Sequence, residues 1–184
     1  MDKKETTQLS KYLSYVLRHR PDEIGIELDD AGWISVDELL EAMRGDGKDV
    51  TIAMLQHVVS TNSKRRFAFN EDQSQIRANQ GHSIKVELGY EPSEPPELLY
   101  HGTVEHFIAL IRAEGIKKGK RHDVHLSPSL ETAADVGSRR GKPIILVVRA
   151  RELHNDGHKL YLTPNGVWLT DCVPVKYIEF PENY

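Results

Sequence analysis

The sequence has one cysteine, no long apolar run and no glycine-rich phosphate loop, and each absence removes a class of protein. A lone Cys172 excludes an internal disulfide framework and a paired-cysteine redox or zinc motif. No apolar stretch approaches the roughly 20 residues that a membrane-spanning helix needs. The first ten residues, MDKKETTQLS, lack the apolar segment of a secretory signal. We therefore expect a cytoplasmic protein that is neither a Rossmann nor a P-loop enzyme.

The basic residues are outnumbered but clustered. The chain has 24 Lys+Arg against 28 Asp+Glu and a net charge of −4, which at first argues against a nucleic-acid partner. The basic residues nevertheless gather in four places, namely Arg18-His19-Arg20, Lys64-Arg65-Arg66, residues 117–122 and Arg139-Arg140. One such cluster can be a solvated loop end, but local clusters set affinity for phosphate, whereas net charge mainly affects long-range steering. Four of them in a short acidic chain favour a phosphate-bearing partner.

Residues 91–97 (EPSEPPE) form the clearest linker. They hold three prolines and three acidic residues and no apolar anchor. The chain is therefore predicted to fold as two lobes of similar size, residues 1–90 and residues 97–184.

The first lobe shows the pattern of helices followed by a hairpin. Apolar residues recur at helical spacing in three segments, each beside a helix boundary signal. These segments are residues 9–17 ahead of Pro21, residues 39–43 after the capping-box pair Ser35 and Glu38, and residues 52–59 after Thr51. Residues 66–69 and 75–78 flank a polar turn and predict a β-hairpin. Helices closed by a two-stranded hairpin predict a winged-helix-like lobe.

The second lobe is rich in short strands. Strands are predicted over residues 98–101, 124–127, 144–149, 160–162, 167–170 and 175–180, with helices over residues 104–114 and 130–136. Gly115 is a typical helix C-terminal cap, and Asn165-Gly166 is most simply a hairpin turn. The expected class of the whole chain is α+β.

Two groups of polar residues in the second lobe could form a ligand site. His101-Gly102-Thr103 follows a strand, where a glycine lets a ligand approach the backbone closely, although the triplet could equally be a turn that caps the next helix. His125 and Ser127 alternate along another predicted strand and so share a face. An inward histidine in a strand can also be an ordinary core residue.

Arginines in both lobes are candidate phosphate ligands. Arg18 and His19 end the first helix, where positive side chains also suit the helix dipole. Lys64 and Arg66 begin the hairpin, and Arg121 lies in a basic loop. Arginine suits phosphate because its planar fork makes two hydrogen bonds at once.

A metal site is not predicted. His122, His125 and Cys172 offer three ligands, but no fourth stands at a recognised spacing. Cys172 also lacks any motif of a thiol nucleophile around it.

Seven motifs resemble those of one family. In chain order they are Leu17-Arg18-His19, Gly25-Ile26-x-Leu28-Asp29-x-x-Gly32-Trp33, Lys64-x-Arg66-Phe67, Ile76-Arg77-Ala78-x-Gln80-Gly81-His82-Ser83, Leu99-Tyr100-His101-Gly102-Thr103, Val124-His125-Leu126-Ser127 and Asn165-Gly166-Val167-Trp168-Leu169. Together they resemble the KptA-type RNA 2′-phosphotransferases, the bacterial relatives of the tRNA 2′-phosphotransferase of eukaryotic splicing. Each motif alone is weak, but seven in this order from about residue 9 to residue 180 are highly specific.

The resemblance implies a fold and a reaction. The fold is a winged-helix-like N-terminal lobe joined to a C-terminal lobe with the ADP-ribosyltransferase fold. In the reaction, an internal RNA 2′-phosphate, of the tRNA splice-junction type, attacks the anomeric carbon of the nicotinamide ribose of NAD⁺, and nicotinamide leaves. The ribose 2″-hydroxyl of this ADP-ribosylated RNA then attacks phosphorus, which releases RNA with a free 2′-hydroxyl and ADP-ribose 1″,2″-cyclic phosphate.

The resemblance also assigns roles to residues. The family's Arg-His-Arg-Arg quartet corresponds to Arg18, His19, Arg66 and Arg121, and Lys64 matches its assisting lysine. The residues implied to hold NAD⁺ are His101, Gly102, Thr103, His125 and Ser127, with Gly137, Arg139 and Arg140 at the pyrophosphate. The glutamate that other ADP-ribosyltransferases use near the scissile bond has no counterpart here, which fits an anionic nucleophile that needs no general base.

Two other functions stay open on the sequence alone. The chain could ADP-ribosylate a terminal phosphate of RNA or DNA and stop after the first step. It could also be a nucleic-acid binder whose second lobe is a degenerate scaffold, against which the intact quartet counts. No membrane association and no obligate protein partner are expected.

Overall fold

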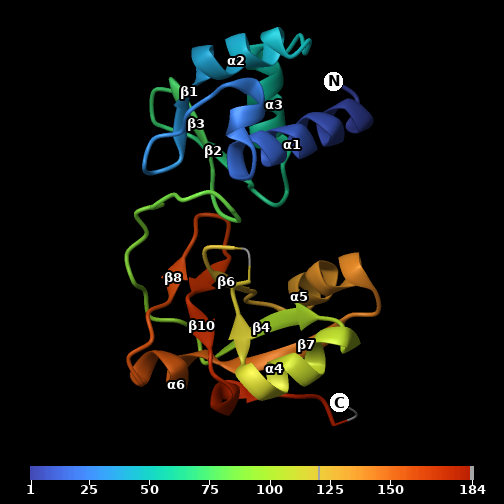
Figure 1. The fold of residues 1–184 in the computed structure, drawn as a ribbon, viewed down its shortest axis with the longest axis vertical. Coiled ribbons are helices and arrows are strands. Elements are labelled where there is room, and N and C mark those ends of the chain that lie inside the picture. Colours follow the sequence, from blue (N-terminus) through green and yellow to red (C-terminus); the bar gives the residue numbers. More distant parts are fainter. Residues whose placement is uncertain (120, 183–184) are drawn as a thin grey trace. The chain divides into compact units, whose positions relative to one another are not determined.

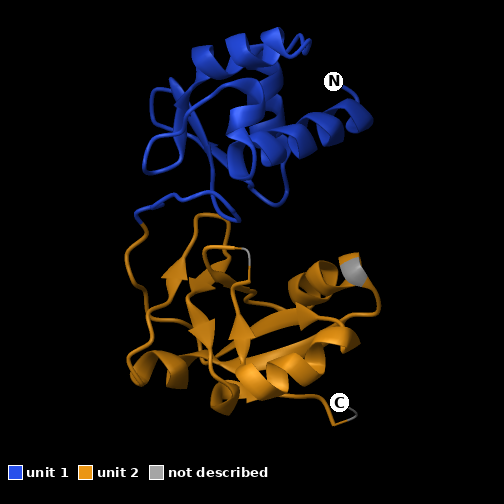
Figure 2. Cartoon of the chain, in the orientation of Figure 1, with its two compact units in different colours: residues 1–89 blue, residues 90–184 orange. Residues whose placement is uncertain are grey.

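The computed structural model describes residues 1–119 and 121–182 and divides into two compact units, residues 1–89 and residues 90–184 (Figures 1 and 2). Over the described residues it is a mixed α/β structure with six α-helices and several small antiparallel sheets. Each unit has a hydrophobic core of its own. In the same described part of the chain, no helix is both long and apolar enough to cross a membrane.

The three helices of unit 1 lie where the sequence predicts them, although the first begins earlier, at Lys3. They are α1 (Lys3–Arg18), α2 (Val36–Gly45) and α3 (Ile52–Thr61), with a short 3₁₀ turn at Pro21–Ile24. The Thr51 hydroxyl accepts from the backbone N–H of Met54 at 3.3 Å and so starts α3. Buried apolar faces of the three helices form the core, to which Leu13, Leu17, Leu39, Met43, Leu55 and Val58 contribute fully buried side chains.

A three-stranded antiparallel sheet closes unit 1. Its order is β1 (Trp33–Ser35), β3 (Gln75–Ala78), β2 (Phe67–Phe69), so the predicted hairpin β2–β3 is confirmed and gains a third strand. Arg66 lies just before β2, not in it as predicted, but its carbonyl still accepts from the backbone N–H of Asn79 at 2.9 Å. The chain on either side of the hairpin is therefore held together where the basic cluster lies.

The largest sheet of unit 2 carries the His101 triplet. Its order is β11 (Ile178–Glu179), β7 (Ile144–Arg149), β4 (Leu98–Thr103), with His101 paired to Leu146. Helix α4 (Ile108–Glu114) follows β4, and Gly115 ends it as predicted, with a φ of 78°. Helix α5 (Leu130–Gly137) packs against β4.

Smaller strand pairs complete unit 2. One sheet has the order β6 (Val124–Leu126), β9 (Trp168–Thr170), β8 (Tyr161–Leu162), and a second pairs β5 (Ile116–Lys117) with β10 (Cys172–Val173). Two reciprocal backbone hydrogen bonds, of 2.8 and 2.9 Å, join Ser127 to Tyr100 and so link the end of β6 to β4. Gly166 has a φ of 79° in the turn between β8 and β9, in agreement with the predicted hairpin turn.

Several parts of unit 2 differ from the prediction, and the paired strands β5 and β10 were not predicted. Residues 175–180, predicted as a strand, begin as a 3₁₀ turn (Val175–Tyr177), and only β11 is extended. Pro174 precedes that turn and fixes its entry. Helix α6 (Ala150–Asn155) follows β7 directly and was not predicted, because six residues are too few to show a helical period.

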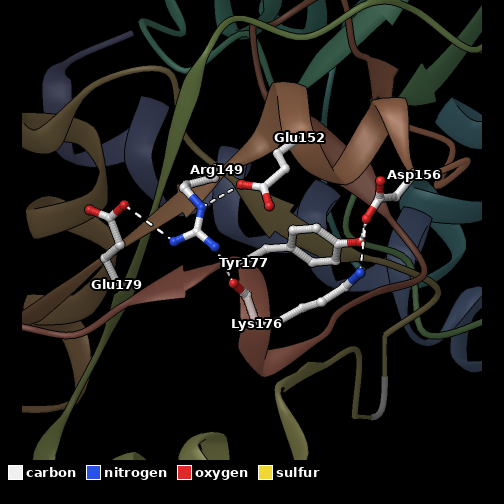
Figure 3. Close-up of polar contacts among 6 residues, drawn as sticks. All are labelled: Arg149, Glu152, Asp156, Lys176, Tyr177 and Glu179. Carbon is white, nitrogen blue, oxygen red and sulfur yellow. Dashed lines mark hydrogen bonds and ion pairs between the residues drawn. The ribbon is translucent and has the colours of Figure 1, made fainter.

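A polar network fixes α6 against the end of unit 2 (Figure 3). Arg149 Nε donates to Glu152 at 2.6 Å, and Arg149 Nη1 lies 3.5 Å from Glu179 on the neighbouring strand. Arg149 also donates to the carbonyl of Lys176. One guanidinium thus joins β7, α6 and the segment before β11.

Asp156 gives this network a pH dependence. Hydrogen bonds from the Lys176 ammonium, at 2.8 Å, and from the Tyr177 hydroxyl hold the pKa of Asp156 below its ordinary value. A carboxylate with a lowered folded-state pKa stabilises the fold above its unfolded pKa of about 3.9, and this stabilisation is lost as the pH falls through the folded-state pKa.

We therefore expect Asp156→Asn to lower the free energy of unfolding by a constant amount above about pH 5, and the difference from the wild type to vanish in acid. Urea unfolding between pH 3 and pH 7 measures this, with Glu131→Gln on α5 as a control for the loss of one exposed carboxylate. A difference that persists undiminished at pH 3 would show that Asp156 acts through packing and not through its charge.

Candidate functional site

Three of the predicted basic residues line one groove of unit 1. Arg18, His19 and Arg66 border a cavity of ≈ 730 Å³ whose walls come from α1, α3 and the segment after α3. Helix α1 ends at Arg18, and His19 is its C-cap. Arg18 and Arg66 are half-buried, whereas His19 is exposed. The groove therefore brings together two residues at the end of α1 and a third that lies 47 positions or more further along the chain.

Arg18 is held by the segment around the hairpin. Its Nη2 donates to the carbonyl of Arg66 at 3.3 Å, and its guanidinium lies 5.9 Å from the centre of the Phe67 ring. Gly81 lies beside it, and a Cβ at that position would make an ordinary contact of 3.5 Å with Arg18 Nη1. Gly81 also has a φ of +87°, which disfavours any other residue. The guanidinium is thus held between two parts of the chain that sequence reasoning placed in separate motifs.

Ser83 orients His19. Its Oγ lies 2.9 Å from His19 Nδ1, and its backbone N–H donates to the carbonyl of Arg18 at 2.9 Å. The Ser83 hydroxyl also lies 3.5 Å from that carbonyl, so one side chain contacts both the ring of His19 and the last turn of α1. Ser83 is the last residue of the motif at residues 76–83, but its role could not be assigned from sequence.

Asn62 orients Arg66. Its Oδ1 accepts from Arg66 Nη1 at 3.4 Å and from the backbone N–H of Lys64 at 3.1 Å. Its Nδ2 donates to the buried Ser10 hydroxyl at 3.1 Å, which ties this loop back to α1. Sequence reasoning missed Asn62, whose position at the C-cap of α3 was the available signal. The Lys64 side chain is exposed and does not line the groove.

In unit 2, His125 contacts both Arg121 and His101. Arg121 Nη1 lies 2.7 Å from His125 Nδ1. Because a guanidinium can only donate, Nδ1 accepts and the neutral His125 ring carries its proton on Nε2. His101 Nδ1 lies 3.1 Å from the carbonyl of His125, which can only accept, so the proton of His101 is on Nδ1 and its Nε2 is an acceptor.

Burial makes His101 a neutral residue. The pKa of His101 lies below its ordinary value chiefly because burial disfavours the cation, and the charge of Arg121 lowers it further. The hydrogen bond to the His125 carbonyl opposes this shift without reversing it. His101 therefore presents an uncharged ring near neutral pH.

Gly102 lies against a helix. A Cβ at Gly102 would lie 1.9 Å from the carbonyl oxygen of Ala133 and 2.9 Å from the backbone nitrogen of Gly137, both on α5. Gly102 was expected to let a ligand approach the backbone closely. On the side where a Cβ would project, helix α5 makes the close approach instead. Thr103, the last residue of β4, and Ser127, which pairs with Tyr100 of the same strand, are both buried.

The remaining predicted residues lie at the end of α5. Gly137 is its last residue and is buried, and a Cβ there would be 3.1 Å from the Thr103 carbonyl. Arg139 is exposed in the following 3₁₀ turn, while the side chain of Arg140 lies outside what the structure describes. Across residues 1–119 and 121–182, no three His, Cys, Asp or Glu side chains gather as metal ligands.

Comparison with known proteins identifies a matching family and several similar proteins. The sequence matches the model of the RNA 2′-phosphotransferase, Tpt1 / KptA family over residues 4–172. A probable RNA 2′-phosphotransferase of Flavobacterium johnsoniae is 53% identical over 180 residues, which cover 98% of this chain and 99% of the relative. Proteins of the same name from Streptomyces coelicolor and Burkholderia pseudomallei are 50% identical over 181 residues and 51% over 175, covering 98% and 95% of each chain. The matched region spans both units and every predicted site residue.

Proposed function

Because the chain belongs to the RNA 2′-phosphotransferase, Tpt1 / KptA family, we propose that it removes a 2′-phosphate from RNA by transferring it to NAD⁺. The observation that carries this proposal is the convergence of Arg18, His19 and Arg66 on one groove of unit 1. These residues are separate in sequence, and each has a supporting contact that fixes its orientation. Arg121, the fourth member of the predicted quartet, comes from unit 2.

The two units support a division of labour. Unit 1, with three helices followed by the β2–β3 hairpin, would be the winged-helix-like lobe that binds the RNA phosphate. Unit 2, with its small antiparallel sheets and short helices, would be the ADP-ribosyltransferase-like lobe that binds NAD⁺. The order of the elements and the position of the His101 triplet on β4 favour this assignment.

The groove of unit 1 suits a phosphate dianion. Arg18 and Arg66 would bind its oxygens through their planar forks, which orients the phosphate for the first transfer. In the second transfer negative charge builds up around phosphorus, and the same fixed donors would stabilise it. His19, held through Nδ1, would use Nε2 to bind the phosphate or to give a proton to the departing RNA oxygen. Lys64 would assist from outside the groove lining by its charge.

The residues around β4 fit a ribose better than an anion. NAD⁺ would supply the electrophilic anomeric carbon and the neighbouring ribose hydroxyl. His101 would accept a hydrogen bond from a ribose hydroxyl at Nε2, since burial keeps its ring neutral. Thr103, Ser127 and the Nε2–H of His125 would add further polar contacts.

The dinucleotide's pyrophosphate needs a cation, which the exposed Arg139 beside α5 would provide together with Arg140. Gly102 and Gly137 would contribute by letting α5 lie close to β4 and so fixing the position of this turn. No residue in this set carries a negative charge that would repel the dinucleotide.

One reaction tests the proposed function. The pure protein is mixed with an oligonucleotide that carries an internal 2′-phosphate, with and without NAD⁺, and the products are separated by mass. Loss of the phosphate only with NAD⁺, together with release of an ADP-ribose cyclic phosphate, is the expected result. Unchanged RNA would refute the proposal. Stable ADP-ribosylated RNA would favour the alternative enzyme, a transferase that stops after the first step.

Replacing Ser83 by alanine is expected to slow the overall transfer about tenfold at neutral pH. The side chain that fixes His19 Nδ1 is lost, whereas the contacts of Arg18 and Arg66 with the groove remain. Because Ser83 acts through His19, the pH profile of the rate should shift as well, and the affinity for RNA should change less than the rate. Rates measured from pH 5.5 to pH 8.5 test this, with Ser60→Ala at the end of α3 as the matched control. An unchanged pH profile would remove Ser83 from the mechanism.

A further inference from the structure

The groove of unit 1 is long and contains no acidic residue. It runs from Lys3 near the start of α1 to Arg18 and His19 at its end. The chain has 28 Asp and Glu, yet none of them lines this groove. Lys3 and Lys11 both line the groove, and among the described residues neither forms an ion pair. An anionic ligand larger than one phosphate would meet positive charge at both ends.

The cations follow one face of α1. Lys3, Thr7, Lys11, Ser14 and Arg18 are spaced three or four residues apart, which places them in one row along the helix. With a rise of 1.5 Å per residue, Lys11 stands about 10 Å from Arg18 along the axis, and Lys3 about 22 Å. Stacked nucleotides repeat at roughly 3.4 Å per strand, so Lys11 is about three nucleotides from Arg18.

Hydroxyl groups between these cations offer hydrogen-bond acceptors to a ligand. Thr7 Oγ1 donates its hydrogen to the carbonyl of Lys3 at 2.8 Å, and Ser14 Oγ donates to the carbonyl of Ser10 at 2.8 Å. On the opposite wall Thr61 Oγ1 donates to the carbonyl of His57 at 2.6 Å. Since a hydroxyl has one hydrogen, the lone pairs of these oxygens are what a ligand meets. The groove therefore presents acceptors between cations.

We propose that this groove binds the ribose–phosphate chain of the nucleotides next to the 2′-phosphorylated one, on one side of it only. Lys3 and Lys11 take backbone phosphates, and Thr7, Ser14 and Thr61 accept from ribose 2′-hydroxyls. A ribose–phosphate chain alternates an anion with a hydroxyl donor, which is the pattern of the groove. DNA lacks that donor, so the groove distinguishes RNA from DNA beyond the reactive nucleotide. This inference rests on the proposed function for the identity of the reactive phosphate, but its test does not.

Binding without NAD⁺ tests the proposal, because no transfer then occurs. We compare a dinucleotide that carries one 2′-phosphate with ten-nucleotide RNAs in which the other eight nucleotides all lie 5′ or all lie 3′ of the phosphorylated pair. One of the two longer RNAs is expected to bind the wild type at least tenfold more tightly than the dinucleotide. The double variant Lys3→Gln/Lys11→Gln should lose most of that gain and leave dinucleotide affinity as it was.

Salt dependence separates specific phosphate contacts from a general effect of net charge. Loss of two phosphate contacts on a single strand should reduce the slope of log Kd against log salt by about 1.4, at about 0.7 for each. The matched control is Lys4→Gln/Lys85→Gln, which removes the same charge from exposed positions of unit 1 outside the groove and should keep the wild-type slope. Equal effects of the two double variants would overturn the proposal, because net charge alone would then explain the binding.

Deoxyribose flanks test the hydroxyl contacts. Replacing the eight flanking nucleotides by DNA should weaken binding to the wild type several-fold, and Thr7→Val/Ser14→Ala should reduce this preference for RNA. If DNA flanks bind as tightly as RNA flanks, the groove is a general polyanion surface and the proposal is wrong. Failure of the proposed function would appear separately, as absence of phosphate transfer with NAD⁺ while the dependence of binding on length and on Lys3 and Lys11 is still present.

Discussion

Arg66→Lys is expected to lower the rate of phosphate transfer a hundredfold or more while leaving the protein folded. Lysine keeps the positive charge but not the planar fork that binds two oxygens at once, and it cannot reproduce the contact with Asn62. Removal of one fixed donor to a developing oxyanion typically costs about 2.7–4 kcal/mol of barrier. The carbonyl of residue 66, which holds Arg18, is unaffected by the substitution.

Single-turnover rates with 2′-phosphorylated RNA and NAD⁺ measure this effect. Nicotinamide release should be followed beside cyclic phosphate release, because accumulation of ADP-ribosylated RNA would assign Arg66 mainly to the second transfer. Arg65→Lys is the matched control, since Arg65 is the exposed neighbour and does not line the groove. A variant at position 66 that kept more than a third of the wild-type rate would show that charge alone suffices there.

Gly102→Ala is expected to destabilise unit 2 by about 3 kcal/mol or more, at or above the top of the usual range for overpacking. The added Cβ would lie 1.9 Å from the Ala133 carbonyl oxygen and 2.8 Å from its carbonyl carbon. Both are backbone atoms and cannot rotate away, so β4 and α5 have to separate. This is a large part of a typical domain stability of roughly 5–15 kcal/mol.

Hydrogen exchange read by mass spectrometry locates the damage. Peptides covering β4 and β7 should lose protection in the variant, while those covering β1 in unit 1 keep it. Gly45→Ala is the control, because nothing lies within 4 Å of a Cβ there and alanine suits the helix α2. Wild-type protection in β4 after Gly102→Ala would mean that α5 does not approach the strand this closely.

Local chemistry explains which elements could be predicted from sequence. Thr51 and Ser35 start their helices through hydrogen bonds to residues three positions away. The local sequence is therefore enough to predict where these helices begin. The strand β1 escapes such reasoning, because three residues show no period and Trp33 becomes extended only by pairing with Arg77, which lies far along the chain. The 3₁₀ turn after Pro174 could not be predicted either, because the β-branched Val175 and Ile178 are typical of strands.

The candidate site divides in the same way. Residue types gave the candidates, because arginine and histidine are the side chains that bind phosphate near neutral pH. Their arrangement depends on long-range packing, since Arg18 meets the Arg66 carbonyl only when α1 packs beside the hairpin. The supporting residues Asn62 and Ser83 could not be distinguished from surface residues beforehand. The same holds for Gly102, whose partner on α5 comes about thirty positions later.

His125 uses different atoms to hold Arg121 and His101, so the two contacts can be separated by mutation. Its ring nitrogen accepts from Arg121, whereas His101 donates to its main-chain carbonyl. A substitution at position 125 that leaves no side-chain acceptor removes the first contact, and none removes the carbonyl that His101 uses. Variants at position 125 should therefore disturb the placement of Arg121 and leave His101 its hydrogen-bond acceptor.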